Sequence, residues 1–108
     1  MDQPQLEQSS QELQTIFEEL LESRNVYYNP PESVRMKYPA IVYNRSRINN
    51  IHANNRVYKQ NHSYEVTVIT SDPDASIIDK ISKLPMCSFD RTFVSDNLYH
   101  NVFTLYHK

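Results

Sequence analysis

The stretch YEVTVITSDPDASIIDKISKLP, residues 64–85, decides the fold, because a strand pattern passes directly into a helix pattern within it. Apolar side chains recur at every second position at Tyr64, Val66 and Val68, which is the period of a half-buried strand. The stretch from Val57 to Thr70 is therefore expected to contain the clearest strand of the chain. A strand followed at once by a helix indicates a chain that mixes both kinds of element.

The residues after this strand predict where the helix begins and ends. Asp72 is a favourable N-cap, and Pro73 suits the first helical position, where no backbone N–H is needed. Pro85 ends the helix. The side chains that we expect to be buried form one stripe, which comprises Ala75, Ile77, Ile78, Ile81 and Leu84.

Three further elements and a loop are predicted upstream. An amphipathic helix spans residues 5–23, where apolar residues recur at spacings of three, four and seven. Val26–Tyr28 is a short strand. Tyr38–Arg45 is a longer strand with Pro39 near its start, where a missing ladder donor does no harm. Residues 46–56, SRINNIHANNR, are polar and show no periodicity, so we expect a long exposed hairpin loop.

Two strands joined by a tight turn are predicted downstream. The first is Cys87–Val94, with Phe89 and Phe93 on one face. Residues 95–97, Ser-Asp-Asn, form the turn without glycine. Leu98–His107 is the last strand.

These elements together predict an α+β fold in the order α-β-β-β-α-β-β. A mostly antiparallel sheet with two helices packed on one face is their natural arrangement. The 108 residues suit a single domain, residues 1–108. A domain of this size buries only about 60–70% of its unfolded surface, so partner surfaces can supply part of the missing burial.

The composition excludes several classes of function. The chain contains no glycine, which phosphate-binding loops, dinucleotide-binding turns and the nucleophile elbow all require. No run of 18 apolar residues is present, so no membrane span is expected. The first residues, MDQPQLEQ, lack the basic and apolar regions of a signal peptide, and a single cysteine suits assembly in a reducing cytoplasm.

No constellation of residues predicts catalysis, a metal site or a cofactor. The four histidines lack the spacing of a helical metal motif, and one cysteine provides no zinc framework. Cys87 is read as a small apolar residue at a strand start rather than as a nucleophile. Asp72, Asp74 and Asp79 do not follow the calcium-loop pattern, and the helix start accounts for the first two.

Charge is distributed unevenly along the chain, although its net value is only −2. Residues 1–23 carry six acids and no Lys or Arg, whereas residues 24–62 carry seven bases and one acid. Acidic and basic surfaces of neighbouring copies can attract one another, although two solvated faces of one monomer explain the pattern equally well. The basic residues interleave with tyrosines, which is typical of protein interfaces and also of platforms that stack single-stranded nucleic acid. The near-neutral charge favours the protein interface.

One protein family shares the order and character of several segments. They are the short opening helix, residues 38–43 (YPAIVY), residues 53–58 (ANNRVY), residues 64–69 (YEVTVI), residues 72–74 (DPD) with the helix that follows, residues 89–91 (FDR) and residues 95–103 (SDNLYHNVF). As a set they resemble the tail-completion, tail-terminator or minor capsid proteins of long-tailed bacteriophages. The resemblance covers about residues 5–106 and includes no catalytic signature.

The resemblance implies a structural protein of the virion without enzymatic activity or cofactor. Members of this family form hexameric rings that cap the head-proximal end of the tail tube. The ring stops polymerisation of the tube protein and then presents a surface to the connector complex of the head. DNA later passes through the lumen without specific binding. Assembly in the host cytoplasm and a final location at the head–tail junction follow.

We nominate ten interface residues for contacts with other copies or partners. Seven belong to the basic middle of the chain and three to the acidic opening helix: Arg45, Arg47, Asn50, His52, Asn54, Asn55 and Arg56, and Glu18, Glu19 and Glu22. A solvated loop remains the alternative for the first group. Two other functions stay open: a head-closure stopper or connector adaptor of the same neck, and a small nucleic-acid-binding module.

Overall fold

The computed structural model describes residues 4–53 and 56–107, and within them the side chains of residues 10–46 and 63–107. The predicted α+β fold and its element order are confirmed. The elements are α1 (Pro4–Leu21), β1 (Val26–Tyr28), β2 (Ala40–Ala53), β3 (Arg56–Thr70), α2 (Ser76–Ser82), β4 (Cys87–Ser95) and β5 (Leu98–His107).

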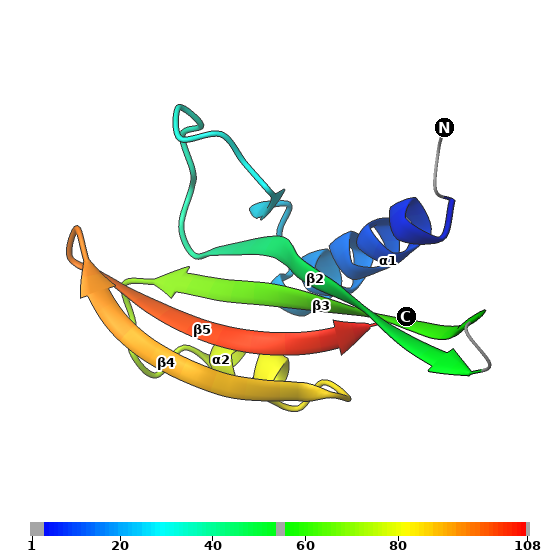
Figure 1. Ribbon diagram of the computed structural model, residues 1–108. Coiled ribbons are helices and arrows are strands. Elements are labelled where there is room, and N and C mark those ends of the chain that lie inside the picture. The colour runs from blue at the N-terminus through cyan, green and yellow to red at the C-terminus, as the bar shows by residue number, and fades with distance from the viewer. Residues whose placement is uncertain (1–3, 54–55, 108) are drawn as a thin grey trace.

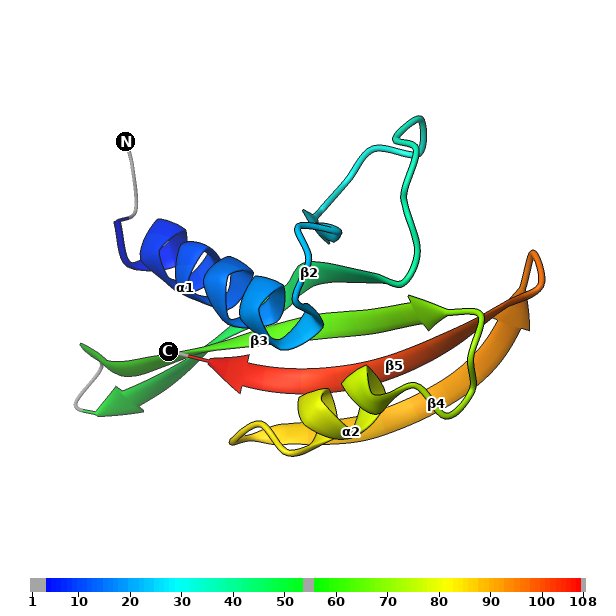
Figure 2. The same ribbon diagram turned by 180° about the vertical axis from the view of Figure 1, so that it is seen from behind.

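The strands form one mixed sheet in the order β1-β2-β3-β5-β4. Every neighbouring pair is antiparallel except β1 and β2, which are parallel and joined by residues 29–39. Both helices lie on the same face of the sheet, behind it in Figure 1 and in front of it in Figure 2. The sheet is therefore mostly antiparallel with two helices on one face, as the sequence predicts.

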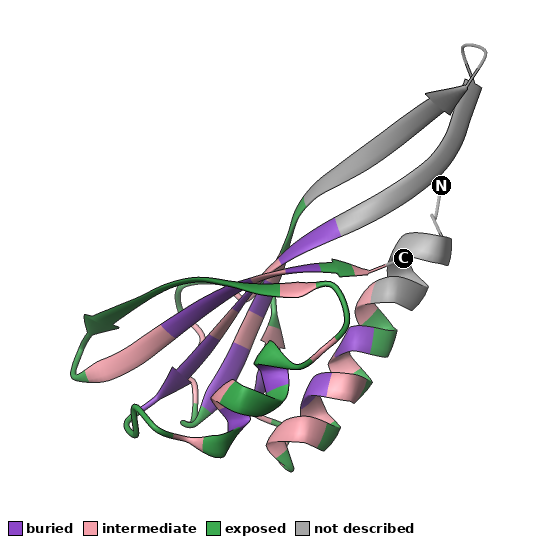
Figure 3. Ribbon diagram, turned by 90° about the horizontal axis from the view of Figure 1, so that it is seen from below, coloured by how far each residue is buried: buried purple, intermediate pink, exposed green. Residues whose placement is uncertain are grey.

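The core forms where the helices meet the sheet. Leu13 and Phe17 of α1 and Ile77 and Ile81 of α2 belong to one buried cluster with apolar side chains of the strands. Figure 3 shows this buried seam between the helices and the central strands. The predicted stripe of the second helix is confirmed, since Ala75, Ile78 and Leu84 pack against the same cluster.

Tyr43 anchors α1 to the sheet. Its ring meets that of Phe17 edge to face at a centroid distance of 5.1 Å. Its hydroxyl lies 2.9 Å from the carbonyl oxygen of Ser10 and 2.8 Å from Oε1 of Gln14, so one proton serves two acceptors. The Gln14 amide in turn donates to the carbonyl oxygen of Val26 at 3.0 Å, which ties β1 to the same helix.

α1 ends two residues earlier than predicted, in a Schellman motif. Ser23 N–H donates to the Glu18 carbonyl and Glu22 N–H to the Glu19 carbonyl, which is the bonding pattern of that motif. Glu22 has a φ of 57° at the position where glycine is usual. A chain without glycine must place other residues in such conformations, and Asp96 and Asn97 do so in the predicted turn between β4 and β5.

The prediction of a long exposed hairpin loop at residues 46–56 is wrong. β2 continues to Ala53 and β3 begins at Arg56, and their ladder reaches the pair Ala53 and Arg56. Polar residues form strands here because two antiparallel strands satisfy each other's backbone groups whatever their side chains. The hairpin extends past the end of β5, whose pairing with β3 begins at His62 (Figure 1), and the longest dimension of the molecule is 50 Å.

The predicted start of the second helix is also wrong. α2 begins at Ser76, with Ala75 as an N-cap that makes no side-chain capping bond. Asp72 instead accepts a hydrogen bond from the N–H of Asp74 at 2.9 Å, which closes a turn ahead of the helix. A short acidic side chain caps turns as readily as helices, so the sequence does not distinguish the two.

Phe89 and Phe93 do not share a face. A bulge between Phe89 and Arg91 places an extra residue in β4. Phe89 is paired with Phe103, which faces the helices, whereas Phe93 is paired with His100 on the opposite side of the sheet. An inserted residue reverses the alternation of side chains beyond it.

Candidate interaction surface

The outer edge of β4 is the most apolar exposed part of the described chain. Among the strands that the structure describes, β4 pairs only with β5, which leaves its other edge open. Of the seven large hydrophobic side chains that are exposed among the described residues, four lie between residues 86 and 94: Met86 (71%), Phe89 (56%), Phe93 (42%) and Val94 (62%). Exposed apolar residues that cluster on one strand edge indicate a contact surface.

Ring contacts hold part of this edge in a fixed arrangement. Phe89 meets Phe103 edge to face at 5.6 Å, and Phe93 stacks on His100 at 4.7 Å with an interplanar angle of 16°. The guanidinium of Arg91 lies 5.9 Å from the Phe93 ring centroid and also pairs with Asp90 at 2.6 Å. Side chains ordered in advance lose little conformational entropy when a partner binds.

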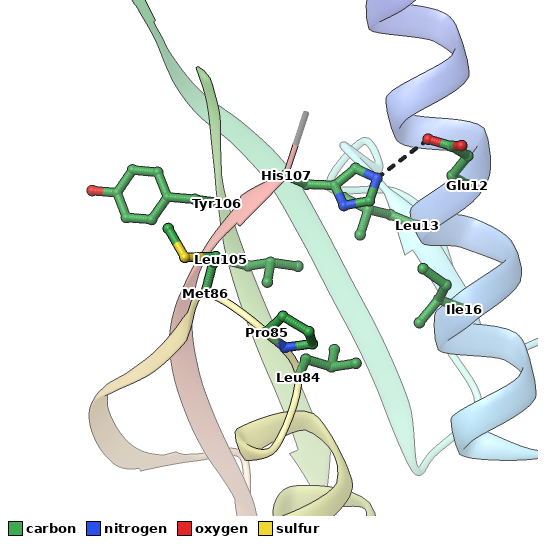
Figure 4. A pocket seen from close by; sticks show the side chains of 9 residues that line it. All are labelled: Glu12, Leu13, Ile16, Leu84, Pro85, Met86, Leu105, Tyr106 and His107. Atoms are coloured by element: carbon green, nitrogen blue, oxygen red, sulfur yellow. Dashed lines mark hydrogen bonds and ion pairs between the residues drawn. The ribbon is translucent and has the colours of Figure 1, made fainter. Parts of the chain in front are cut away.

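A groove of about 380 Å³ adjoins the start of β4. Figure 4 shows that α1 forms one wall, the turn after α2 forms the floor, and the end of β5 forms the other wall. The lining is apolar except at the rim, where His107 Nε2 lies 3.3 Å from Glu12 Oε1. The residues that line it are Glu12, Leu13, Ile16, Leu84, Pro85, Met86, Leu105, Tyr106 and His107.

Met86 joins the groove to the strand edge. Its backbone is left-handed, with a φ of 61°, which costs a residue with a Cβ roughly 1–2 kcal/mol. Its carbonyl accepts a hydrogen bond from Tyr106 N–H at 3.0 Å, and this bond helps to hold the conformation. Strained residues with exposed side chains often lie at binding sites.

The three nominated acids come together at the C-terminal end of α1. Glu18, Glu19 and Glu22 line one shallow depression of about 450 Å³ with Arg24. Glu18 is half-buried and accepts a hydrogen bond from Gln14, and Glu22 lies 3.6 Å from the ammonium group of Lys80. Glu19 is exposed.

Five of the seven nominated basic and polar residues lie on the hairpin of β2 and β3, away from these acids. Arg45 is exposed on β2. Arg47, Asn50 and His52 lie in β2 and Arg56 begins β3, but their side chains fall outside the described ones, and Asn54 and Asn55 lie outside the described residues. Figure 2 shows the hairpin extending on the side of the N-terminal end of α1, whereas the three acids occupy its C-terminal end.

Burial shifts the pKa of the half-buried Cys87 and of the buried Tyr43. Burial raises the pKa of the Cys87 thiol, which is the opposite of what a nucleophilic cysteine requires. Burial, with smaller contributions from Tyr28, Tyr64 and Glu18, raises the pKa of Tyr43 far above its ordinary value.

No group of three or more His, Cys, Asp or Glu side chains suited to a metal ion occurs in the part of the chain that the structure describes. No helix within residues 4–53 and 56–107 is both long and apolar enough to cross a membrane.

The sequence did not reveal the β4 edge or the groove. The apolar residues of β4 follow an ordinary strand pattern, and local sequence patterns do not predict the order of strands in the sheet. The adjacent charges Asp90 and Arg91 inside the strand are the one signal of an edge position.

Comparison with known proteins gives no relative for this chain. No protein-family model matches it, and neither a curated protein nor a solved structure is significantly similar to it.

Proposed function

We propose that this chain is a non-enzymatic structural subunit of a tailed bacteriophage virion, a tail terminator that closes into a homo-hexameric ring on the tail tube. The observation that carries the proposal is that one compact unit bears two unlike surfaces: the apolar β4 edge and the hairpin of β2 and β3. A ring of identical copies needs two such surfaces, because its interfaces are heterologous. A single self-complementary surface closes a dimer instead.

The charge distribution supports contact between unlike surfaces. The acids at the C-terminal end of α1 and the bases of the hairpin, Arg45 among them, lie in different parts of the molecule. The two groups belong to different elements of one copy, so the acids of one copy can lie against the bases of the next. Such complementarity steers association and fixes its orientation.

In this proposal the ring ends the growth of the tail tube and then receives the head-closure and connector proteins. DNA passes through the lumen without specific binding, which suits a chain with a net charge of only −2, because many phosphate contacts retain a duplex. Assembly takes place in the host cytoplasm, the ring stays at the head–tail junction of the virion, and no cofactor takes part.

Localisation in purified particles tests the proposal. Tails assembled without heads and heads assembled without tails are purified separately, and the chain is detected in each by mass spectrometry. A terminator is found on the tails, and a stopper or connector adaptor, the alternative function in the same neck, on the heads. Absence of the chain from both kinds of particle and from the whole virion contradicts every neck function.

A nucleic-acid-binding module is the second candidate. Residues 45–62 hold four basic residues and no acidic one, and they lie largely in a two-stranded hairpin, a shape that a major groove admits. A gel-shift titration against salt tests it. Submicromolar binding with a steep salt dependence favours this candidate over the ring.

A further inference from the structure

The sheet has two long unpaired strand edges, one at each margin. The first is the outer edge of β4. The second belongs to β2. β1 pairs with β2 only at residues 41–43, and the N–H of Asn29 adds one further hydrogen bond, to the Tyr43 carbonyl. From Asn44 to Ala53 no strand of the described chain pairs with that side of β2.

The two halves of the β4 edge differ in how well they can pair with another strand. The bulge at Asp90 and its ion pair with Arg91 interrupt the first half of β4, and both devices discourage another strand. The second half, residues 91–95, has an unbroken register with β5 and carries the exposed Phe93 and Val94. Five residues are the length of an ordinary strand.

The hairpin needs a further strand more than any other part of the sheet. Beyond the end of β5, β2 and β3 pair only with each other within residues 4–53 and 56–107. Two-stranded hairpins are marginally stable in water, and a third strand is the usual remedy. The free edge of β2 is long enough to accept all five residues, 91–95, of the second half of β4.

We propose that residues 91–95 of β4 pair with the free edge of β2, within residues 44–53, on a neighbouring copy of this chain. The two edges lie at opposite margins of the sheet, so the pairing continues the sheet from copy to copy and uses a different surface on each side. This inference rests on the proposed function, because it names the interface by which the ring closes.

An added charge distinguishes this partner from a second β4 edge. The stretch 44–53 contains Arg45 and Arg47 and no acidic residue. A positive charge added to β4 therefore meets positive charge across the proposed interface, whereas a negative charge meets its opposite. Across an interface of two β4 edges, either added charge meets itself.

The experiment compares Val94→Lys, Val94→Glu and the matched control Ser71→Lys, which adds the same charge to an exposed turn. Self-association is measured by sedimentation over a range of protein concentrations. We expect Val94→Lys to raise the dissociation constant about tenfold or more, Val94→Glu to raise it less, and Ser71→Lys to leave it unchanged. Equal weakening by Lys and Glu overturns the choice of β2.

Hydrogen exchange of the wild-type chain supplies the second measurement. On association, amides within 44–53 and 91–95 become slower to exchange, while those of residues 101–105, already paired on both sides in the monomer, keep their rates. Protection that appears on one edge alone, or association without protection on either, overturns the inference. The inference is also overturned if the wild-type chain stays monomeric at every concentration.

The outcomes separate this inference from the proposed function. Rings found at the head–tail junction with unprotected β4 amides refute the edge pairing and leave the function standing. Edge pairing in a chain that is missing from virions refutes the function and leaves the interface standing.

Discussion

β4 and β5 lie side by side and pair along most of their length, yet their apolar residues have opposite environments. Val102, Phe103 and Leu105 of β5 are at most 3% exposed, whereas Phe93 and Val94 of β4 are open to solvent. β5 has a strand on each side, while β4 ends the sheet. Apolar residues on β5 therefore stabilise the monomer, whereas apolar residues on β4 remain available for a partner.

The largest expected change in stability comes from truncating a phenylalanine of β5, and the same change on β4 should cost much less. Phe103→Ala should lower the free energy of unfolding by about 3–5 kcal/mol, because it opens a cavity in the core. Phe93→Ala, on the exposed side of β4, should lower it by only about 1 kcal/mol, through loss of its stack on His100. Urea denaturation measures both, and equal losses would break the comparison.

Tyr43→Phe is the next largest change. Removing the hydroxyl leaves the Ser10 carbonyl and Gln14 without this donor, so we expect a loss of about 1–2 kcal/mol. Tyr28→Phe, in the exposed ring beside it, serves as the control and should change stability little. A loss from Tyr28→Phe as large as that from Tyr43→Phe would contradict the anchoring role of the buried hydroxyl.

The same residue predicts a dependence on pH. The folded chain keeps Tyr43 protonated at pH values where the unfolded chain ionises it, so the unfolded state binds fewer protons above pH ~10. Its contribution to stability is therefore complete below pH ~10 and decreases as the pH rises further. The difference in unfolding free energy between wild type and Tyr43→Phe should narrow over that range, and a constant difference would contradict burial of the neutral group.

Glu22→Gly should have a smaller effect of the opposite sign. Glycine adopts the left-handed conformation at the end of α1 without strain, and the change removes a negative charge from the negative end of the helix dipole. We expect a gain of about 0.5–1 kcal/mol after the entropy of the unfolded glycine is subtracted. Glu19→Gly, inside the helix, should instead lose about 1 kcal/mol, and thermal unfolding distinguishes the two.

The smallest effect on monomer stability is expected for Val94→Lys. The side chain is already exposed, so the free energy of unfolding of dilute protein should change by less than about 0.5 kcal/mol. A large loss in dilute protein would show that Val94 belongs to the monomer core and would remove the contrast with β5.

The sequence predicts the parts of the fold that local patterns determine. The strand Leu98–His107 and the strand Val26–Tyr28 have the predicted bounds, and the stripe around Ile77 and Ile81 is buried as expected. Local sequence patterns do not predict the structure where pairing between strands determines it. Residues 46–53 form a strand because β3 lies opposite them, and the faces of Phe89 and Phe93 depend on a bulge that no composition reveals.

The candidate site was predictable only in part. The clustering of Glu18, Glu19 and Glu22 follows from helical spacing, and the structure brings them to one depression. The exposure of β4 follows from the order of strands in the sheet, which is a property of the whole fold. Whether the nominated residues contact a partner remains a prediction.

Imaging the purified protein together with growing tail tubes tests the ring most directly. We expect a six-fold collar of this chain on one end of each tube and tubes that stop lengthening once the collar is present. Tubes that keep growing with both ends bare, while the protein stays free in solution, would contradict it.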